Sequence, residues 1–196
     1  MAVNVIAPPA VEPITLDEAK THCRVEHDAE DAFIAGLILA AREHCEGFQA
    51  RAYVTQTLEL TLDAWPSGSE LKVPRPPLRS VTHIKFVDKD GVETTWDASN
   101  YVVAAKGSPG RIVLGYGKSW PAATLRPAEA IAIRYEAGYG DASAVPQRVK
   151  QAMLLLVGHW YENHEAVAAA RQRGESLPIP FGVDRLLWPN RVFGAR

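Results

Sequence analysis

The sequence predicts an α+β fold in which helices from both ends of the chain form one core and an antiparallel β region is inserted between them. Before residue 50 and after residue 146, apolar residues recur every three or four positions, as on one face of a helix. Between these regions they alternate with polar residues, as in half-buried strands. Turn sequences recur at short intervals there, which favours a small antiparallel sandwich or barrel-like domain.

Two helices are predicted in the first quarter of the chain. Thr15 and Glu18 have the spacing of a capping box, which predicts a short helix over residues 16–23. Asp28 precedes a longer helical pattern that ends near Gln49. The apolar stripe expected to be buried on this second helix consists of Phe33, Leu37, Ala40, Ala41, Cys45 and Phe48.

The period changes from helical to strand-like after Thr55, because every second residue over 58–62 is leucine. Strands over 81–87 and 92–96 flank the turn sequence at 88–91, whose glycine suits a hairpin loop. Further strands are predicted over residues 101–104, 111–114 and 130–137. These segments account for the inserted β region.

A third helix is predicted from Pro146, which suits a first helical turn, to Asn163. The polar, alanine-rich stretch 166–177 is interpreted as a frayed helix end or a loop, and a short amphipathic helix is expected before Pro189. The predicted domains are 1–53 (N-terminal helical part of the core), 54–144 (inserted β domain), 145–165 (C-terminal helix of the core) and 166–196 (linker and C-terminal tail).

Composition excludes several classes of protein. No run approaches the roughly 18 apolar residues of a membrane helix, and residues 1–11 lack signal-peptide features, so a soluble, unexported protein is expected. Cys23 and Cys45 are expected to be free thiols. The net charge of -2 combines an acidic front, with 4 basic and 9 acidic residues over 1–52, and a basic end, with 7 and 4 over 146–196. This distribution is not that of a nucleic-acid binder.

Candidate catalytic and ligand-binding motifs are incomplete. The glycine that a phosphate-binding loop ending at Gly117-Lys118-Ser119 requires would fall at Ile112. His159 and His164 lie five residues apart, roughly 140° around a helix, and are badly placed to share a metal. Four more metal-binding side chains belong to the first two helices: His22, Cys23, His44 and Cys45. We predict no catalytic residue, no metal site and no cofactor.

Two groups of residues are candidates for protein contacts. The tail combines apolar anchors such as Leu186 and Trp188 with arginines, and the residues themselves leave open whether it meets a partner or folds back on its own helices. On the third helix, His159, Trp160 and Tyr161 are expected in the core or in a subunit interface.

In the order and spacing of its segments, the chain resembles the phage head-tail connector proteins, also called adaptor or head completion proteins, in which a β domain is inserted in a helical core. The most distinctive segment is Leu154 to Asn163. The other segments on which the resemblance rests are residues 14–20 with Arg24-Val25 and 28–31, residues 74–78 with Ser80-Val81, residues 135–140, the run from Val145 to Glu165, and the C-terminal segment 182–192. The chain departs from the family pattern at Cys23 and in the stretch 166–173.

The resemblance implies a structural role without catalysis. It implies a homo-oligomeric ring, a dodecamer, that binds the portal protein on one side and a tail or stopper protein on the other. The ring would leave an axial channel through which DNA passes. No membrane contact is implied. Such subunits belong to the neck of phage, prophage or gene transfer particles and assemble in the bacterial cytoplasm. The resemblance also assigns portal binding to the tail, for which we predict Gly182, Val183, Leu186, Leu187, Trp188, Arg191 and Val192.

Other functions stay open at this point. Another neck component, such as a stopper or tail-completion protein, would share the ring and dock lower down. A small hydrolase would need carboxylates assembled from the β region. A carbohydrate-binding module would need Trp65, Trp96 and Trp120 to be exposed and coplanar.

Overall fold

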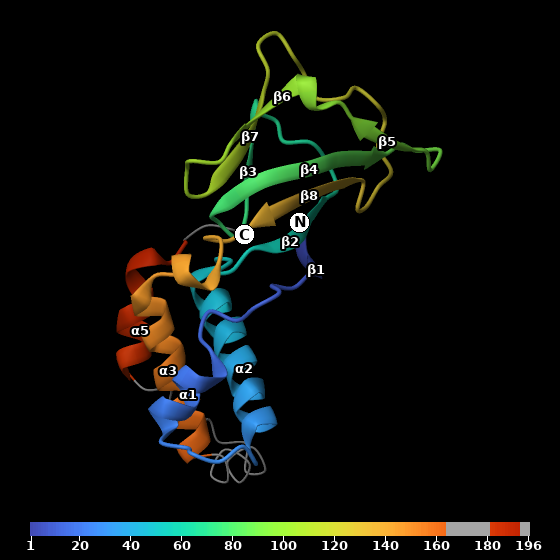
Figure 1. The fold of residues 1–196 in the computed structure, drawn as a ribbon. Coiled ribbons are helices and arrows are strands. Elements are labelled where there is room, and N and C mark those ends of the chain that lie inside the picture. Colours follow the sequence, from blue (N-terminus) through green and yellow to red (C-terminus); the bar gives the residue numbers. More distant parts are fainter. Residues whose placement is uncertain (164–180, 193–196) are drawn as a thin grey trace. The chain divides into compact units, whose positions relative to one another are not determined.

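The computed structural model describes residues 1–163 and 181–192. The chain divides into two compact units, each built from segments that are distant in sequence. The helical unit comprises Val11–Gln49 and Gly140–Arg191, and the β unit comprises Met1–Ala10, Ala50–Tyr139 and Val192–Arg196. The fold is therefore α+β with antiparallel sheets, as predicted (Figure 1).

The helical unit contains α1 (Leu16–Cys23), α2 (Asp31–Gln49), α3 (Gln147–Glu162) and α5 (Phe181–Leu187). Helix α3 packs against each of the other three, although α1 and α2 precede it by about a hundred residues or more. Its buried face consists of Val149, Ala152, Met153, Leu156 and Val157. The predicted packing of N-terminal helices with a C-terminal helix is confirmed.

Helix α1 begins and ends as its sequence dictates. The Glu18 backbone N–H donates to Thr15 Oγ1 over 3.1 Å, and the Thr15 N–H donates to Glu18 Oε2 over 2.6 Å, which completes the predicted capping box. Arg24 ends the helix in the left-handed conformation at φ 58°. Lys20 Nζ links α1 to the segment before α2 and to the first residue of α2, because it lies 2.6 Å from Asp28 Oδ1 and 2.7 Å from Asp31 Oδ1.

Helix α2 buries only part of the predicted stripe: Ala41 and Cys45 are buried, and Leu37 and Phe48 are half-buried. Phe33 is 43% exposed and Ala40 is exposed, whereas the buried residues are Ile34, Ile38, Ala41, Arg42, Cys45, Glu46 and Gln49. Two charged residues hold the centre of this face. Arg42 Nε lies 2.8 Å from Glu12 Oε2, and its Nη1 lies 3.1 Å from Glu46 Oε2. The pattern of apolar residues could not reveal the charged part of this face, because these charges are buried only where they compensate one another in the interior.

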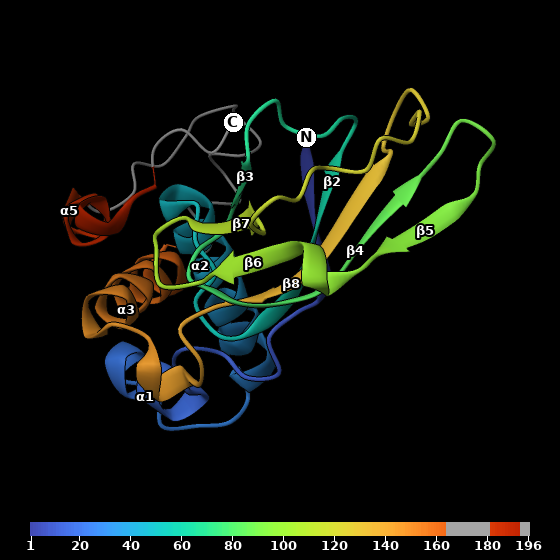
Figure 2. The ribbon, with the colours of Figure 1, turned by 90° about the horizontal axis from the view of Figure 1, so that it is seen from above.

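The β unit contains a five-stranded sheet in the order β1-β2-β8-β4-β5 and a three-stranded sheet in the order β3-β7-β6, all antiparallel (Figure 2). The larger sheet uses β1 (Ala2–Ala7), β2 (Gln56–Leu62), β4 (Leu78–Val87), β5 (Glu93–Trp96) and β8 (Ile131–Ala137). The smaller uses β3 (Glu70–Val73), β6 (Tyr101–Ala104) and β7 (Gly110–Leu114). Within residues 1–163 and 181–192, single-turn 3-10 helices lie at Ala98–Asn100, Ala142–Ala144 and Trp188–Asn190.

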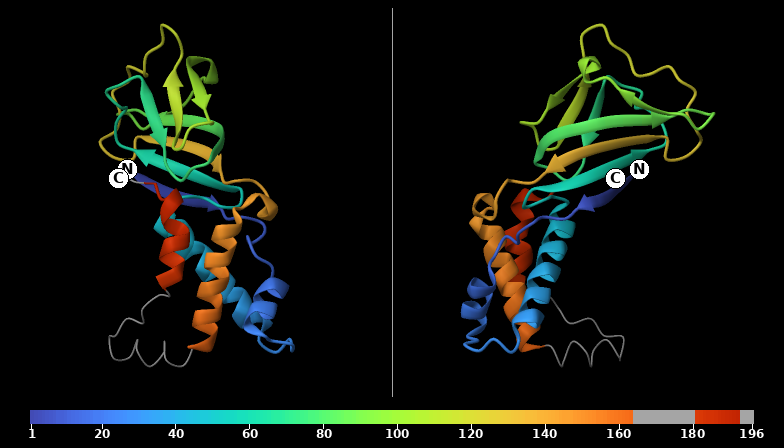
Figure 3. Two further views of the ribbon diagram at one scale, coloured as in Figure 1. Left: turned by 90° about the vertical axis from the view of Figure 1, so that its left-hand side faces the viewer. Right: turned by 45° about the vertical axis from the view of Figure 1, so that its right-hand side comes forward.

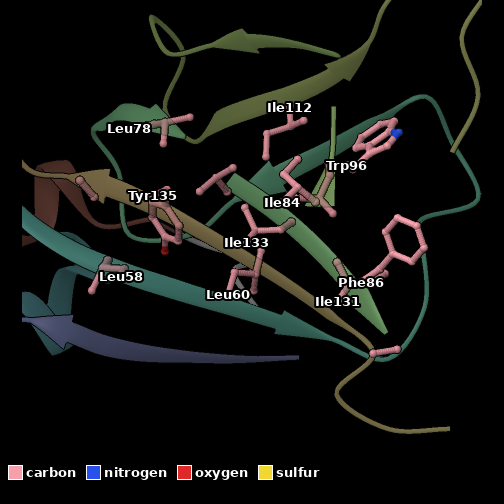
Figure 4. Close-up of a cluster of buried hydrophobic side chains, with 14 of the residues drawn as sticks. Leu58, Leu60, Leu78, Ile84, Phe86, Trp96, Ile112, Ile131, Ile133 and Tyr135 are labelled. Carbon is pink, nitrogen blue, oxygen red and sulfur yellow. The ribbon is translucent and has the colours of Figure 1, made fainter. Parts of the chain in front are cut away.

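The core of the β unit lies between the two sheets (Figure 4). Strands β2 and β8 pair so that Leu58 faces Tyr135 and Leu60 faces Ile133, and all four side chains are almost completely buried. The Tyr135 hydroxyl donates to the Pro74 carbonyl oxygen over 3.0 Å, which satisfies the polar end of a buried aromatic ring. Ile112 of the smaller sheet is fully buried in the same cluster.

The predicted strands are all present, and strands β1 and β3 were not predicted. Residues 2–7, which the predicted domains assign to the helical part, pair with β2. The sheets are open, so the barrel-like alternative is not the observed one. The stretch 166–177 lies outside the described residues. Among the residues that are described, no helix is long and apolar enough to cross a membrane.

Candidate functional site

The predicted portal-binding tail forms helix α5 and the turn after it. Val183 and Leu187 are four residues apart, so they share one face of α5, and both are fully buried. The helix packs against α3 and α2, and the Gln49 side-chain amide donates to the Leu187 carbonyl oxygen. The tail therefore folds back on its own helices. Val183 and Leu187 are internal anchors and do not offer their side chains to a partner in this structure.

The remaining residues of the predicted tail site stay accessible. Gly182, Trp188 and Arg191 are exposed, and Leu186 and Val192 are half-buried. Trp188 is 56% exposed, and its ring lies 6.5 Å from that of Phe48 on α2, measured between centroids. Arg191 places its guanidinium carbon 4.7 Å from the Phe48 centroid and 5.5 Å from the Trp188 centroid. These cation–π contacts hold an aromatic ring and a positive charge together at the surface.

The last turns of α3 carry His159, Trp160 and Tyr161, all half-buried. Trp160 meets the His44 ring edge-on, with centroids 6.2 Å apart. The Tyr161 hydroxyl donates to Glu30 Oε2 over 2.5 Å, a hydrogen bond that raises the pKa of this tyrosine. Asn163 Nδ2 donates to the His159 carbonyl oxygen over 2.8 Å. These residues join α3 to α2 and to the segment before α2, and their role in a subunit interface stays a prediction.

The candidate metal ligands do not come together. The described part of the chain contains no group of three or more histidine, cysteine, aspartate or glutamate side chains that could hold a metal ion, and His164 lies outside that part. Both thiols are free. Burial raises the pKa of Cys45 to about 12, and burial followed by the Glu162 charge raises that of Cys23. Both thiols are therefore protonated and weakly nucleophilic at neutral pH.

The candidate ligand-binding features of the β unit are structural. Gly117 sits in a turn at φ 70°, where the Lys118 N–H donates to the Gly115 carbonyl oxygen over 3.0 Å. The three tryptophans pack on one another: Trp65 and Trp120 stack with centroids 5.1 Å apart, and Trp96, only 8% exposed, lies 5.2 Å from Trp120. Their faces cover each other and are not arranged as an exposed platform for a sugar.

Comparisons with known proteins agree with the family that the sequence resembles. The model of the family described as "Head completion protein" matches residues 12–180. A search of curated proteins found no match.

Solved structures of gene transfer agent particles are similar over the whole chain. One, the neck of an empty particle with C6 symmetry, has a TM-score of 0.80 at 28% identity. A second, the virion of a native particle, has a TM-score of 0.79 at 26% identity. A third, the neck of a native particle with C12 symmetry, has a TM-score of 0.74 at 27% identity. Each covers 100% of this chain and 98% of the other.

Proposed function

Because this chain belongs to the head completion protein family, we propose that it is a structural neck subunit, the head-to-tail adaptor that forms a ring beneath the portal of a tailed-phage-like particle. The ring is a dodecamer that joins the portal to a tail or stopper protein and leaves an axial channel for DNA. The subunit performs no catalysis, and the particle assembles in the bacterial cytoplasm.

The observation that carries this proposal is the end-to-end similarity to chains from particle necks. The similarity covers 98% of those chains as well as all of this one, so it includes the helical unit, the β unit and the tail. One of those necks was computed with C12 symmetry, which is the symmetry of a dodecameric ring, and another with C6 symmetry, which such a ring also contains.

We place the portal contact at Trp188 and Arg191, supported by Gly182, Leu186 and Val192. An aromatic ring and an arginine are the side chains that most often dominate a protein interface. Here both are exposed, and Phe48 orients both, so little side-chain freedom is lost on docking. Val183 and Leu187 contribute indirectly, because they fix α5 to the helical unit.

The test is co-sedimentation of the full-length chain with rings of the cognate portal protein, with stoichiometry read by mass. We expect saturable binding at one chain per portal subunit. Replacing Trp188 by alanine should weaken binding at least about tenfold, as at an interface hot spot. Tyr116→Ala is the matched control, since it removes a fully exposed aromatic residue from the β unit and should leave binding unchanged.

Point substitution is preferable to deletion of the tail, because a deletion would also remove Val183 and Leu187 from the core. Undiminished binding of Trp188→Ala would refute the contact assigned to the tail. Absence of binding by the wild-type chain to intact portal rings would refute the adaptor role and favour a stopper or tail-completion protein.

We propose further that the acidic first part of the chain faces the DNA channel. Five of its carboxylate side chains are exposed: Asp17, Glu18, Glu26, Asp28 and Glu43. A basic wall would bind DNA by releasing counterions, whereas carboxylates leave it free to pass. In a density map of an assembled particle, these residues are expected to point into the channel. Their location on the outer rim would contradict the assignment.

A further inference from the structure

The four edges of the two sheets differ in their protection against pairing with another chain. Charged side chains are one of the devices that protect exposed edges, besides bulges and very short strands, because the unpaired N–H and C=O groups of an edge accept a further strand. Edge strand β3 carries Glu70 and Lys72, and edge strand β5 carries Glu93, which lies 2.6 Å from Lys85. Edge strands β1 and β6 contain no charged residue, so they lack this protection.

Strand β1 is apolar and incompletely covered. Val3 pairs with Leu60 and Val5 with Leu58, so both valines lie on the face that carries the core. Val3 packs against the core, but Val5 is 52% exposed and Ile6, at an irregularity in the register, is 44% exposed. Among the described residues β1 pairs only with β2, so alternate backbone groups along its other edge have no strand partner.

Strand β6 offers a second edge of the same kind. Its four residues are Tyr101, Val102, Val103 and Ala104, and Val102 is 60% exposed. In the described part of the chain its one neighbouring strand is β7. The two uncharged edges lie apart on the β unit: β1 is the margin of the larger sheet, and β6 is a margin of the smaller sheet that faces it (Figure 3).

We propose that edge strand β1 of one subunit pairs with edge strand β6 of the next subunit around the ring. This inference rests on the proposed ring. A ring of identical copies requires a head-to-tail interface in which two different surfaces of the subunit meet. Strands β1 and β6 are two different surfaces, and their pairing would bring together the two edges that carry no charge. Pairing of β1 with another β1 would be isologous and would close a dimer.

The first test places a lysine on the exposed edge, in the full-length chain. Val5→Lys and Val102→Lys each place a positive charge on an edge strand, and this charge would lose water when the edge pairs with another strand. Because that loss is unfavourable, each variant should form rings on portal rings about tenfold less, or lower still. Val92→Lys is the matched control: it replaces a valine that is 57% exposed in the loop between β4 and β5, and it should assemble like the wild type. Circular dichroism of each monomer checks that folding is unchanged.

The second test identifies the two edges by thiol crosslinking, in a Cys23→Ser background that leaves only the buried Cys45. A mixture of Val5→Cys and Val102→Cys chains assembled on portal rings should form crosslinked pairs with a short bifunctional reagent. Either variant alone should not. Crosslinking of Val5→Cys alone, or no crosslinking in the mixture, would overturn the proposed pairing.

The two proposals fail in different ways. If the wild type assembles on portal rings and both lysine variants assemble equally well, the strand pairing is wrong and the adaptor role stands. If the wild type does not bind portal rings, the adaptor role fails. The same cysteine mixture, at high concentration without portal, then decides whether the edges pair.

Discussion

Replacing Arg42 by methionine is expected to lower the free energy of unfolding by about 3–5 kcal/mol, because it removes the guanidinium charge that lies 3.1 Å from the buried carboxylate of Glu46. Arg42 is 5% exposed and Glu46 is 3% exposed. Methionine preserves most of the length and apolar surface of arginine, so the change isolates the charge. Urea unfolding followed by far-ultraviolet circular dichroism, which reports mainly on the helices, measures the effect.

Two further variants separate charge compensation from packing. Arg148→Met removes an exposed arginine from α3 and should change stability by less than about 0.5 kcal/mol. The double variant Arg42→Met, Glu46→Met removes both charges and should be more stable than the single variant, since two apolar side chains of similar volume replace a buried ion pair. A single variant as stable as the wild type would show that the pair contributes nothing to folding.

Replacing Gly138 by alanine is expected to destabilise the β unit by roughly 3–5 kcal/mol, at the upper end of single-residue effects. Gly138 follows strand β8 at φ 129°, a conformation that side chains rarely adopt. An added Cβ would lie 2.6 Å from the carbonyl carbon and oxygen of Val54 and 2.7 Å from the Thr55 nitrogen. Because these are backbone atoms, no side-chain rotation relieves the clash. Urea unfolding followed by tryptophan fluorescence measures the loss.

Two other glycines of the β unit serve as controls. Gly117 has φ 70° but open space around its Cβ position, so Gly117→Ala should cost only the backbone strain, about 1–3 kcal/mol. Gly68 has open space without a positive φ, and Gly68→Ala should be close to neutral. If Gly138→Ala were no worse than Gly117→Ala, the close approach of the Val54 backbone would be irrelevant to stability.

Sequence patterns predicted most elements but only part of the buried face of α2, namely Ala41 and Cys45. The stripe chosen from apolar residues included Phe33 and Ala40, which are exposed. The true face includes Arg42, Glu46 and Gln49, which look like surface residues in isolation. Glu12 lies thirty residues from Arg42 in the chain, so nothing in the local pattern of α2 reveals that the guanidinium is compensated.

The sequence analysis missed two strands. Strand β3 was missed although Leu71 and Val73 are buried and alternate with Glu70 and Lys72; with four residues it is no shorter than β5 and β6, which were predicted. In β1, Val3 and Val5 alternate, but the irregularity between Val5 and Ala7 breaks the period at Ile6. Since β1 is mostly exposed on both faces, its sequence also lacks the alternation of apolar and polar residues that a half-buried strand shows.

For the tail, the sequence could not divide the predicted residues between the core and the surface. The spacing of Val183 and Leu187 indicates a shared face, yet that face suits a partner as well as it suits α3. The contact between Arg191 and Phe48 joins positions more than 140 residues apart, and neither residue type predicts the other. Only the packed helical unit shows which side chains of the tail stay accessible.

The division of the helical unit into residues 11–49 and 140–191 also sets the order in which the chain is completed during synthesis. When α2 leaves the ribosome, the partner of its buried face has not been made, and residues 50–139 must be translated first. At about 5–20 residues per second, this delay lasts roughly 5 to 18 seconds. The β unit has all its strands once residue 137 has emerged, because β1 precedes β2 in the chain and β8 ends there. The β unit therefore has its complete set of strands before the helical unit has α3, the helix against which both α1 and α2 pack.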